Sequence, residues 1–87
     1  MINTVRFSEK AYKQLSKLEK PVQKLILNWL TKNLEGTTNP RLKGKALVSN
    51  HSGEWRYRIG DYRLIADIQD DAVIILIIAV GHRKDIY

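Results

Sequence analysis

The 87-residue chain contains no cysteine, so neither a disulfide framework nor a cysteine-containing zinc site can form. Its two histidines, His51 and His82, are isolated in the sequence and do not make a metal cage. We therefore expect no metal and no cofactor.

Long hydrophobic runs are also absent. The longest, residues 72–80, has nine residues, which is about half the length of a membrane-spanning helix. Met1 leads into polar Asn3 and Thr4 rather than into an apolar stretch preceded by positive charge, which does not fit a secretory signal. We expect a cytoplasmic protein with no membrane partner.

The length and composition are those of one globular domain. A chain this short cannot support two hydrophobic cores, and 44% hydrophobic with 28% charged residues is an ordinary globular balance. We therefore expect a single domain over residues 1–87.

The net charge of +6 is unevenly distributed. Residues 1–49 hold ten Lys or Arg against three Glu, whereas residues 50–87 hold five against six acidic residues. A small basic protein is typical of a partner of something anionic, such as nucleic acid or the ribosome. Solubility alone is the other explanation of the charge.

The first half predicts a strand and two helices. Residues 2–7 alternate as a strand, and Ser8 is a suitable N-cap for a helix ending near Leu18. Pro21 suits the first position of a second helix, and Gly36 its C′ position. The apolar stripe of that helix consists of Val22, Leu25, Ile26, Trp29, Leu30 and Leu34.

The second half predicts a β-meander after an irregular loop over residues 37–52. Its three β-rich runs are residues 54–59, 62–69 and 72–80. The pairs Gly60-Asp61 and Asp70-Asp71 separate these runs, and such short connections join adjacent antiparallel strands. The predicted fold class is α+β, in the order β-α-α-β-β-β, with a helical hairpin on one face of a four-stranded, mainly antiparallel sheet.

The segment GEWRYRIGDYR crowds three arginines into one hairpin. With a turn at residues 60 and 61, Arg58 lies directly opposite Arg63, and Arg56 shares their face, away from the helices. Like charges opposed in this way weaken strand pairing. Either a neighbour such as Asp67 or Glu54 pairs with the arginines on a solvated face, or the cluster holds a polyanion, which forked guanidinium groups suit.

The last strand brings the tail GHRKDIY beside this hairpin. A two-residue turn at 70–71 would place Ile78 opposite Arg63 and Val80 opposite Asp61. We therefore expect the tail residues to lie near the arginine cluster. They are His82, Arg83, Lys84 and Tyr87.

The segment WRYRIGDYRLIADIQDD, followed by an apolar strand and AVGHRKDIY, resembles the C-terminal half of the RelE group in the RelE/ParE toxin superfamily. The predicted order of elements agrees over essentially all 87 residues. The resemblance implies a RelE-like, microbial-RNase-like fold. It also implies a type II toxin that inhibits translation as a ribosome-dependent, metal-independent mRNA endoribonuclease and is neutralised by a RelB-like antitoxin.

The resemblance also implies a site. Its basic strand residues correspond to Arg56, Arg58 and Arg63, and its C-terminal Arg and Tyr to Arg83 and Tyr87. The hypothesis is that Arg58, Arg63 and Arg83 hold the scissile phosphate while a ribose 2′-OH attacks it. The remaining assignments are His82 as general acid, Tyr87 as a stacking or proton-transfer group, and Arg56, Lys43, Lys45 and Lys84 as RNA-binding residues.

The sequence leaves the general base and the exact function open. Some members have lysines at the positions of Arg56 and Arg58, and others a Glu near the position of Lys45, whereas arginine stays protonated. The ParE branch has a similar fold but poisons DNA gyrase. A non-catalytic RNA- or ribosome-binding module is the third alternative.

Overall fold

The computed structural model describes residues 2–46 and 54–84. Its elements follow the order β-α-α-β-β-β-β along the chain. They are β1 (Thr4–Phe7), α1 (Glu9–Ser16), α2 (Lys20–Asn33), β2 (Lys45–Ala46), β3 (Glu54–Ile59), β4 (Tyr62–Gln69) and β5 (Ile74–His82).

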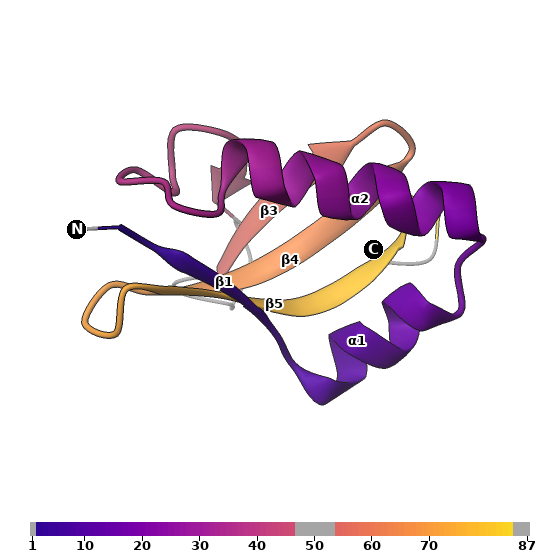
Figure 1. Cartoon of the computed structure of the whole chain (residues 1–87), viewed down its shortest axis with the longest axis horizontal. Helices are drawn as coiled ribbons and strands as arrows, with labels where there is room; N and C mark the ends of the chain where they lie inside the picture. The colour runs from indigo at the N-terminus through magenta and orange to yellow at the C-terminus, as the bar shows by residue number, and fades with distance from the viewer. Residues whose placement is uncertain (1, 47–53, 85–87) are drawn as a thin grey trace.

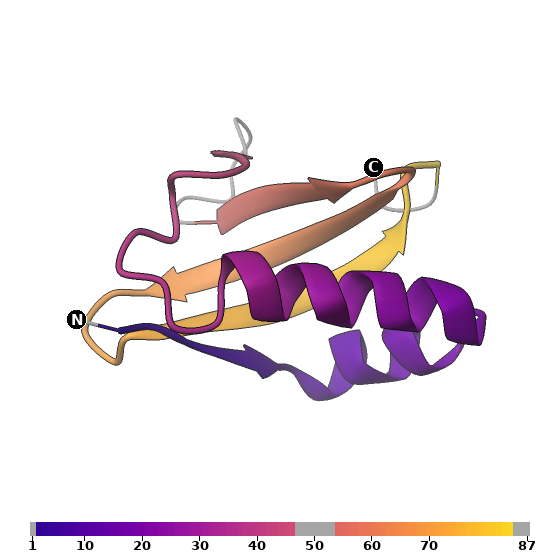
Figure 2. The same cartoon turned by 45° about the horizontal axis from the view of Figure 1, so that its top comes forward.

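The strands form one mixed sheet with the spatial order β1-β5-β4-β3-β2. β1 pairs in parallel with β5, and the other neighbours are antiparallel. Both helices lie on the same side of this sheet (Figures 1 and 2). The predicted α+β class and helical layer are confirmed, but the predicted count of four strands is wrong. The fifth strand, β2, is only two residues long and lies in the segment expected to be irregular.

The predicted N-cap at Ser8 is confirmed, and α2 starts at Lys20, one residue before the predicted start at Pro21. Ser8 has an extended backbone, and its side-chain oxygen accepts a hydrogen bond from the Ala11 N–H at 3.1 Å. Pro21 lies in the first turn of α2, where its missing N–H is not needed. Leu34 caps the end of α2, so Gly36 lies one residue later than predicted. There its N–H donates to the Asn3 carbonyl and ties the helix exit to β1.

The core confirms the predicted alternation on β3 and β4. Tyr57 and Leu64 are fully buried and directly opposed across these strands. They pack with Ile26 and Leu30 of α2, and Trp29 and Trp55 cover the cluster as partly buried residues. Because strand side chains alternate between faces, Arg56, Arg58 and Arg63 lie on the side away from the helices.

The β4–β5 connection differs from the prediction. It spans 70–73, closed by a hydrogen bond from the Val73 N–H to the Asp70 carbonyl, and β5 starts only at Ile74. Ala66 then lies opposite Ile77, but Ile65 lies opposite Ala79.

The residue between these partners, Ile78, is therefore extra and forms a bulge. A bulge of one residue reverses which face the following side chains take. Val80 accordingly lies in the core, and Gly81 rather than Ile78 lies opposite Arg63.

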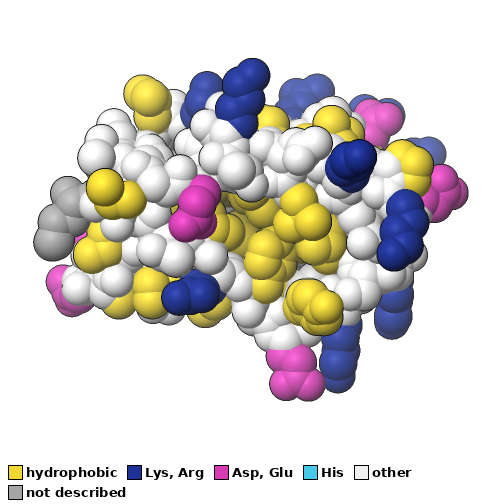
Figure 3. All heavy atoms as spheres, in the orientation of Figure 1, with side chains coloured by type: hydrophobic (Ala, Val, Ile, Leu, Met, Phe, Trp, Pro, Cys, Tyr) yellow, Lys and Arg dark blue, Asp and Glu magenta, His cyan; other side chains and the backbone are white. Residues whose placement is uncertain are grey.

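The helix side carries apolar surface with dispersed cations. Figure 3 shows hydrophobic side chains gathered below α2, with Lys and Arg side chains scattered around them. A cavity of about 260 Å³ lies between β1 and α2, lined by Val5, Phe7, Leu27, Leu30, Thr31 and Glu35. Within the described part of the chain, no helix has the length and apolar character needed to cross a membrane.

Tyr57 makes stability sensitive to alkaline pH. Burial raises its pKa to about 12, above the ordinary value. The unfolded chain loses this proton first, so the stabilisation is complete below about pH 10 and is lost as the pH rises through 12. We expect the free energy of unfolding to fall by about 2–3 kcal/mol more in the native protein than in Tyr57→Phe over this interval.

Urea unfolding between about pH 9 and 12 measures this difference. Tyr12, which is 63% exposed, supplies the control, because Tyr12→Phe should keep the native pH dependence. A Tyr57→Phe protein whose stability falls as steeply as that of the native protein would contradict the prediction.

Candidate functional site

The β3–β4 hairpin places like charges directly opposite each other. Arg58 faces Arg63 across the predicted turn at residues 60 and 61, which confirms the predicted register. On the other side of β3, Lys45 of β2 faces Arg56. β3 therefore takes part in two cationic cross-strand pairs, one with each neighbouring strand, although such pairs weaken strand pairing.

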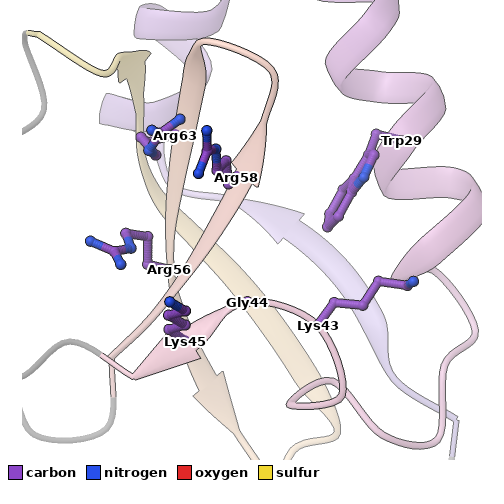
Figure 4. Close-up of a pocket in the computed structure, with 7 residues that line it drawn as sticks. All are labelled: Trp29, Lys43, Gly44, Lys45, Arg56, Arg58 and Arg63. Carbon is purple, nitrogen blue, oxygen red and sulfur yellow. The ribbon is translucent and has the colours of Figure 1, made fainter.

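The cationic side chains meet at one cavity of about 390 Å³. It is lined by Trp29, Lys43, Gly44, Lys45, Arg56, Arg58 and Arg63. Figure 4 shows the three arginines on the hairpin, Trp29 on α2, Lys45 on β2 and Lys43 in the loop before β2, with the Lys43 ammonium directed away from the arginines. The structure thus brings five of the predicted cationic residues together.

Two aromatic residues of β3 hold the loop that carries these lysines. The indole Nε1–H of Trp55 donates to the Lys43 carbonyl at 2.7 Å, and the Tyr57 hydroxyl donates to the Pro40 carbonyl. Arg41 of the same loop binds Asp70, just after β4, through both guanidinium nitrogens, at 3.0 and 2.9 Å. The loop is therefore fixed to the sheet at three points.

Gly44 allows the loop to lie directly on β3. Its φ is +82°, a left-handed value that favours glycine. A Cβ atom here would lie 2.2 Å from the Arg56 carbonyl oxygen and 2.9 Å from Trp55 Nε1. Only glycine fits this approach, which sets the positions of Lys43 and Lys45 on either side.

The positive charges of the neighbouring arginines act on Arg63. Desolvation and the positive charges of Arg58, Arg56 and Arg83 lower the pKa of Arg63, and Asp61 opposes this effect. One guanidinium nitrogen of Arg63 donates to the Gly60 and Tyr62 carbonyls, both at 3.1 Å. These bonds hold the Arg63 guanidinium over the turn.

Ion pairs with neighbouring carboxylates do not neutralise Arg58 and Arg63 in the described part of the chain. Asp67 accepts a hydrogen bond from the Gln69 side chain at 3.1 Å. Among residues 2–46 and 54–84, no carboxylate forms an ion pair with Arg58 or Arg63. The arrangement therefore favours an external anion over a self-neutralised surface.

The tail is divided between the two faces. The Arg83 N–H donates to the Asp61 carbonyl at 2.8 Å, which holds the tail beside the hairpin as predicted. His82 lies opposite Tyr62, and their rings meet edge to face with centroids 5.5 Å apart. Tyr62 covers the core, so the bulge at Ile78 has placed His82 on the helix side and away from the arginines.

Two further predicted residues are not part of the cavity as described. The Lys84 N–H donates to His82 Nδ1 at 3.2 Å, which places it next to that histidine. Tyr87 lies outside the described residues.

The sequence reasoning missed two residues of the cavity. Trp29 belongs to the predicted apolar stripe of its helix. The periodicity of that stripe does not distinguish a residue buried in the core from one that lies above an open sheet edge. Gly44 falls in the predicted irregular loop over residues 37–52, and a glycine there is the only signal of its positive φ and close approach to β3. Chemically, the cavity combines bidentate phosphate donors with an aromatic wall.

The chain has relatives among known toxins. Residues 5–87 match the family model described as the ParE toxin of type II toxin–antitoxin systems. The toxin RelG of Mycobacterium tuberculosis is 33% identical over 97% of this chain and 94% of its own length.

Solved structures agree with these relatives. A chain of the toxin–antitoxin complex RelBE2 of M. tuberculosis is 30% identical and superposes with a TM-score of 0.85, covering 98% of this chain and 95% of that one. A chain of the archaeal RelE–RelB complex of Pyrococcus horikoshii is 26% identical, with a TM-score of 0.73 and coverage of 98% and 99%.

Gly44 and Gly60 form a matched pair of test positions. Both have positive φ, but a Cβ at Gly60 would meet nothing within 4 Å. Gly60→Ala should lower the free energy of unfolding by about 1–2 kcal/mol, the cost of a left-handed residue. Gly44→Ala should lower it further, because the loop must also move off the Arg56 carbonyl. Urea denaturation checks the order, and equal losses would contradict it.

Removing one charge of the opposed pair should stabilise the hairpin. We expect Arg58→Gln to raise the urea midpoint at low salt, since the repulsion with Arg63 is lost. The gain should fade at about 1 M salt, where the Debye length is only about 3 Å.

The control is Lys24→Gln, which removes the same charge from an exposed position on α2. Its midpoint should not show this salt-dependent gain. A lower midpoint for Arg58→Gln at low salt would show that Arg58 stabilises the fold instead.

Proposed function

Because this chain belongs to the RelE/ParE superfamily of toxins from type II toxin–antitoxin systems, we propose that it is an endoribonuclease that cuts mRNA in the decoding site of the ribosome. The carrying observation is the convergence of Arg56, Arg58 and Arg63 on one cavity. Two opposed cationic pairs weaken strand pairing, and we expect such pairs where a bound anion offsets that cost. Cleavage there inhibits translation.

The proposed reaction is a transesterification within RNA. The ribose 2′-oxygen attacks the adjacent phosphorus and forms a 2′,3′-cyclic phosphate. The bond from phosphorus to the 5′-oxygen breaks, the 2′-OH gives up its proton, and the leaving 5′-oxygen gains one. The phosphate gains negative charge in the transition state, and fixed cationic donors stabilise that charge.

The arginines differ in their proposed roles. Arg58 and Arg63 bind the scissile phosphate from the two hairpin strands, and Arg83 adds positive charge beside Arg63. Arg56, Lys43 and Lys45 guide the rest of the strand by electrostatic attraction. Tyr87 and Lys84 keep their predicted roles in stacking and RNA binding.

Proton transfer depends on groups other than the arginines, because arginine stays protonated. We propose that the ribosome aligns the 2′-OH with the phosphate, so that positioning supplies much of the acceleration. Free RNA should accordingly be cut poorly. The edge-on contact of His82 with Tyr62 does not favour its predicted role as general acid, which stays a prediction.

We propose a RelB-like antitoxin as the neutralising partner. Chains of the RelBE2 and RelE–RelB complexes share this fold. The clustered cations favour an antitoxin segment with acidic residues that folds on binding. It would either cover the arginine face or displace the tail.

The match to the ParE family model supports a second candidate, a gyrase poison. A gyrase poison does not need cations that converge on one phosphate. The two candidates differ in what is damaged after induction, since a gyrase poison produces DNA damage signalling with intact mRNA.

The test is induction in cells followed by mapping of mRNA 5′ ends. We expect in-frame cuts within codons for the native toxin. Arg63→Ala and Arg83→Ala should each abolish growth inhibition and slow cleavage on programmed ribosomes by roughly 100- to 1,000-fold, the usual effect of removing one preorganised donor.

The matched control is Lys24→Ala, which removes a cation from an exposed position on α2 that does not line the cavity and should leave cleavage unchanged. Intact mRNA with induced DNA damage would overturn the nuclease in favour of the gyrase poison. Full toxicity of a folded Arg63→Ala variant would remove Arg63 from the site.

A further inference from the structure

The cavity has two chemically different walls. One consists of the side chains of Arg56, Arg58 and Arg63 on the hairpin, and the other is the side chain of Trp29 on α2 (Figure 4). Phosphate chemistry uses the first wall only. The proposed function therefore leaves the aromatic wall without a role.

The two walls meet because the edge of the sheet is open between them. β2 pairs with β3 at Trp55 and Arg56, and its described pairing goes no further along β3. Arg58 lies beyond that point, so the cavity extends around the strand edge from the arginine side to the helix side. Trp29 lies on the helix side of this edge.

Trp29 is held in place but not covered. Its ring contacts Tyr57, with centroids 5.7 Å apart and planes at 54°. Tyr57 is fully buried and anchored to the Pro40 carbonyl, so it fixes the indole from below. Trp29 packs on the core as a partly buried residue, and its remaining surface lines the cavity.

We propose that Trp29 is a stacking platform for one nucleobase of the bound RNA, next to the phosphate held by Arg58 and Arg63. The cavity volume of about 390 Å³ lies in the usual range of small-ligand sites, roughly 300–1,000 Å³. A flat aromatic side chain beside a cationic groove is the general arrangement by which proteins hold single-stranded nucleic acid.

The platform should contribute affinity rather than codon preference. Stacking uses the π-face that every base has, so it tolerates any sequence. This inference rests on the proposed function, because it assigns a second contact to the same RNA.

The test is a thermodynamic cycle that compares the binding of two RNA probes to the native protein and to a Trp29 variant. The first probe is a trinucleotide of 2′-O-methyl RNA, which lacks the attacking hydroxyl and is not cut. The second probe is the same trinucleotide with one base deleted and all its phosphates kept, tried at each position in turn. Trp29→Leu should weaken binding of the complete trinucleotide by roughly 5- to 150-fold, the range for one stacked base. It should have much less effect on the trinucleotide lacking the stacked base.

Trp29→Phe is the matched variant, because it keeps a ring at the site and should restore most of the binding. A variant that merely folds poorly would lose both probes equally. Equal losses at every position therefore overturn the platform. A lack of binding of the complete trinucleotide to the native protein at millimolar concentration also overturns it.

A second readout uses 5-fluorotryptophan. The chain has two tryptophans, and only Trp29 lines the cavity among the described residues. The Trp29 fluorine resonance should move during titration with the complete trinucleotide, and the Trp55 resonance should move less. The reverse order overturns the proposal.

Cleavage on programmed ribosomes separates the two proposals. If the native toxin cuts ribosome-bound mRNA but the cycle shows no coupling to Trp29, the platform is wrong and the nuclease stands. If coupling is measured and no mRNA is cut, the nuclease is wrong and the aromatic RNA site remains.

Discussion

The two-residue turn at Gly60-Asp61 places two guanidinium groups opposite each other, although their like charges repel. The turn sets the register of the β3–β4 ladder, and the register puts Arg58 opposite Arg63. Their repulsion acts on the solvent face only. On the other face Tyr57 lies opposite Leu64, both fully buried, and burial of these side chains offsets the repulsion. The hydrophobic core therefore holds the cationic cluster in place.

The loop before β3 depends on the same strand. Gly44 lies on the Arg56 carbonyl, and the side chains of Trp55 and Tyr57 bind loop carbonyls on either side of that contact. β3 thus presents Arg56 and Arg58 to solvent on one face. Trp55 and Tyr57 on its other face anchor the loop that carries the lysines. A shift of β3 would move both sets of cations together. Such coupling suits a site that must present its charge in a fixed arrangement, because preorganised donors need no rearrangement during the reaction.

The bulge at Ile78 sorts the C-terminal residues. Without it, the strand alternation would carry His82 to the side of Arg63. With it, His82 packs on Tyr62, Gly81 lies opposite Arg63, and Arg83 emerges where its charge acts on that arginine. The site that results is richer in positive charge and poorer in titratable groups than the tail sequence indicates. This composition agrees with the proposed mechanism, in which the toxin stabilises charge and the ribosome aligns the RNA.

The sequence alone determined the local features: the N-cap at Ser8, the alternation on β3 and β4, the turn at residues 60 and 61, and the opposition of Arg58 and Arg63. Each follows from spacing within a short segment. Tertiary structure alone decided the formation of the two-residue strand β2 and the contact of Gly44 with the Arg56 carbonyl. It also decided on which face of the sheet His82 lies and that Trp29 lines the cavity. These depend on which backbone approaches which across the fold, and a single extra residue in one strand changes them without altering any local pattern.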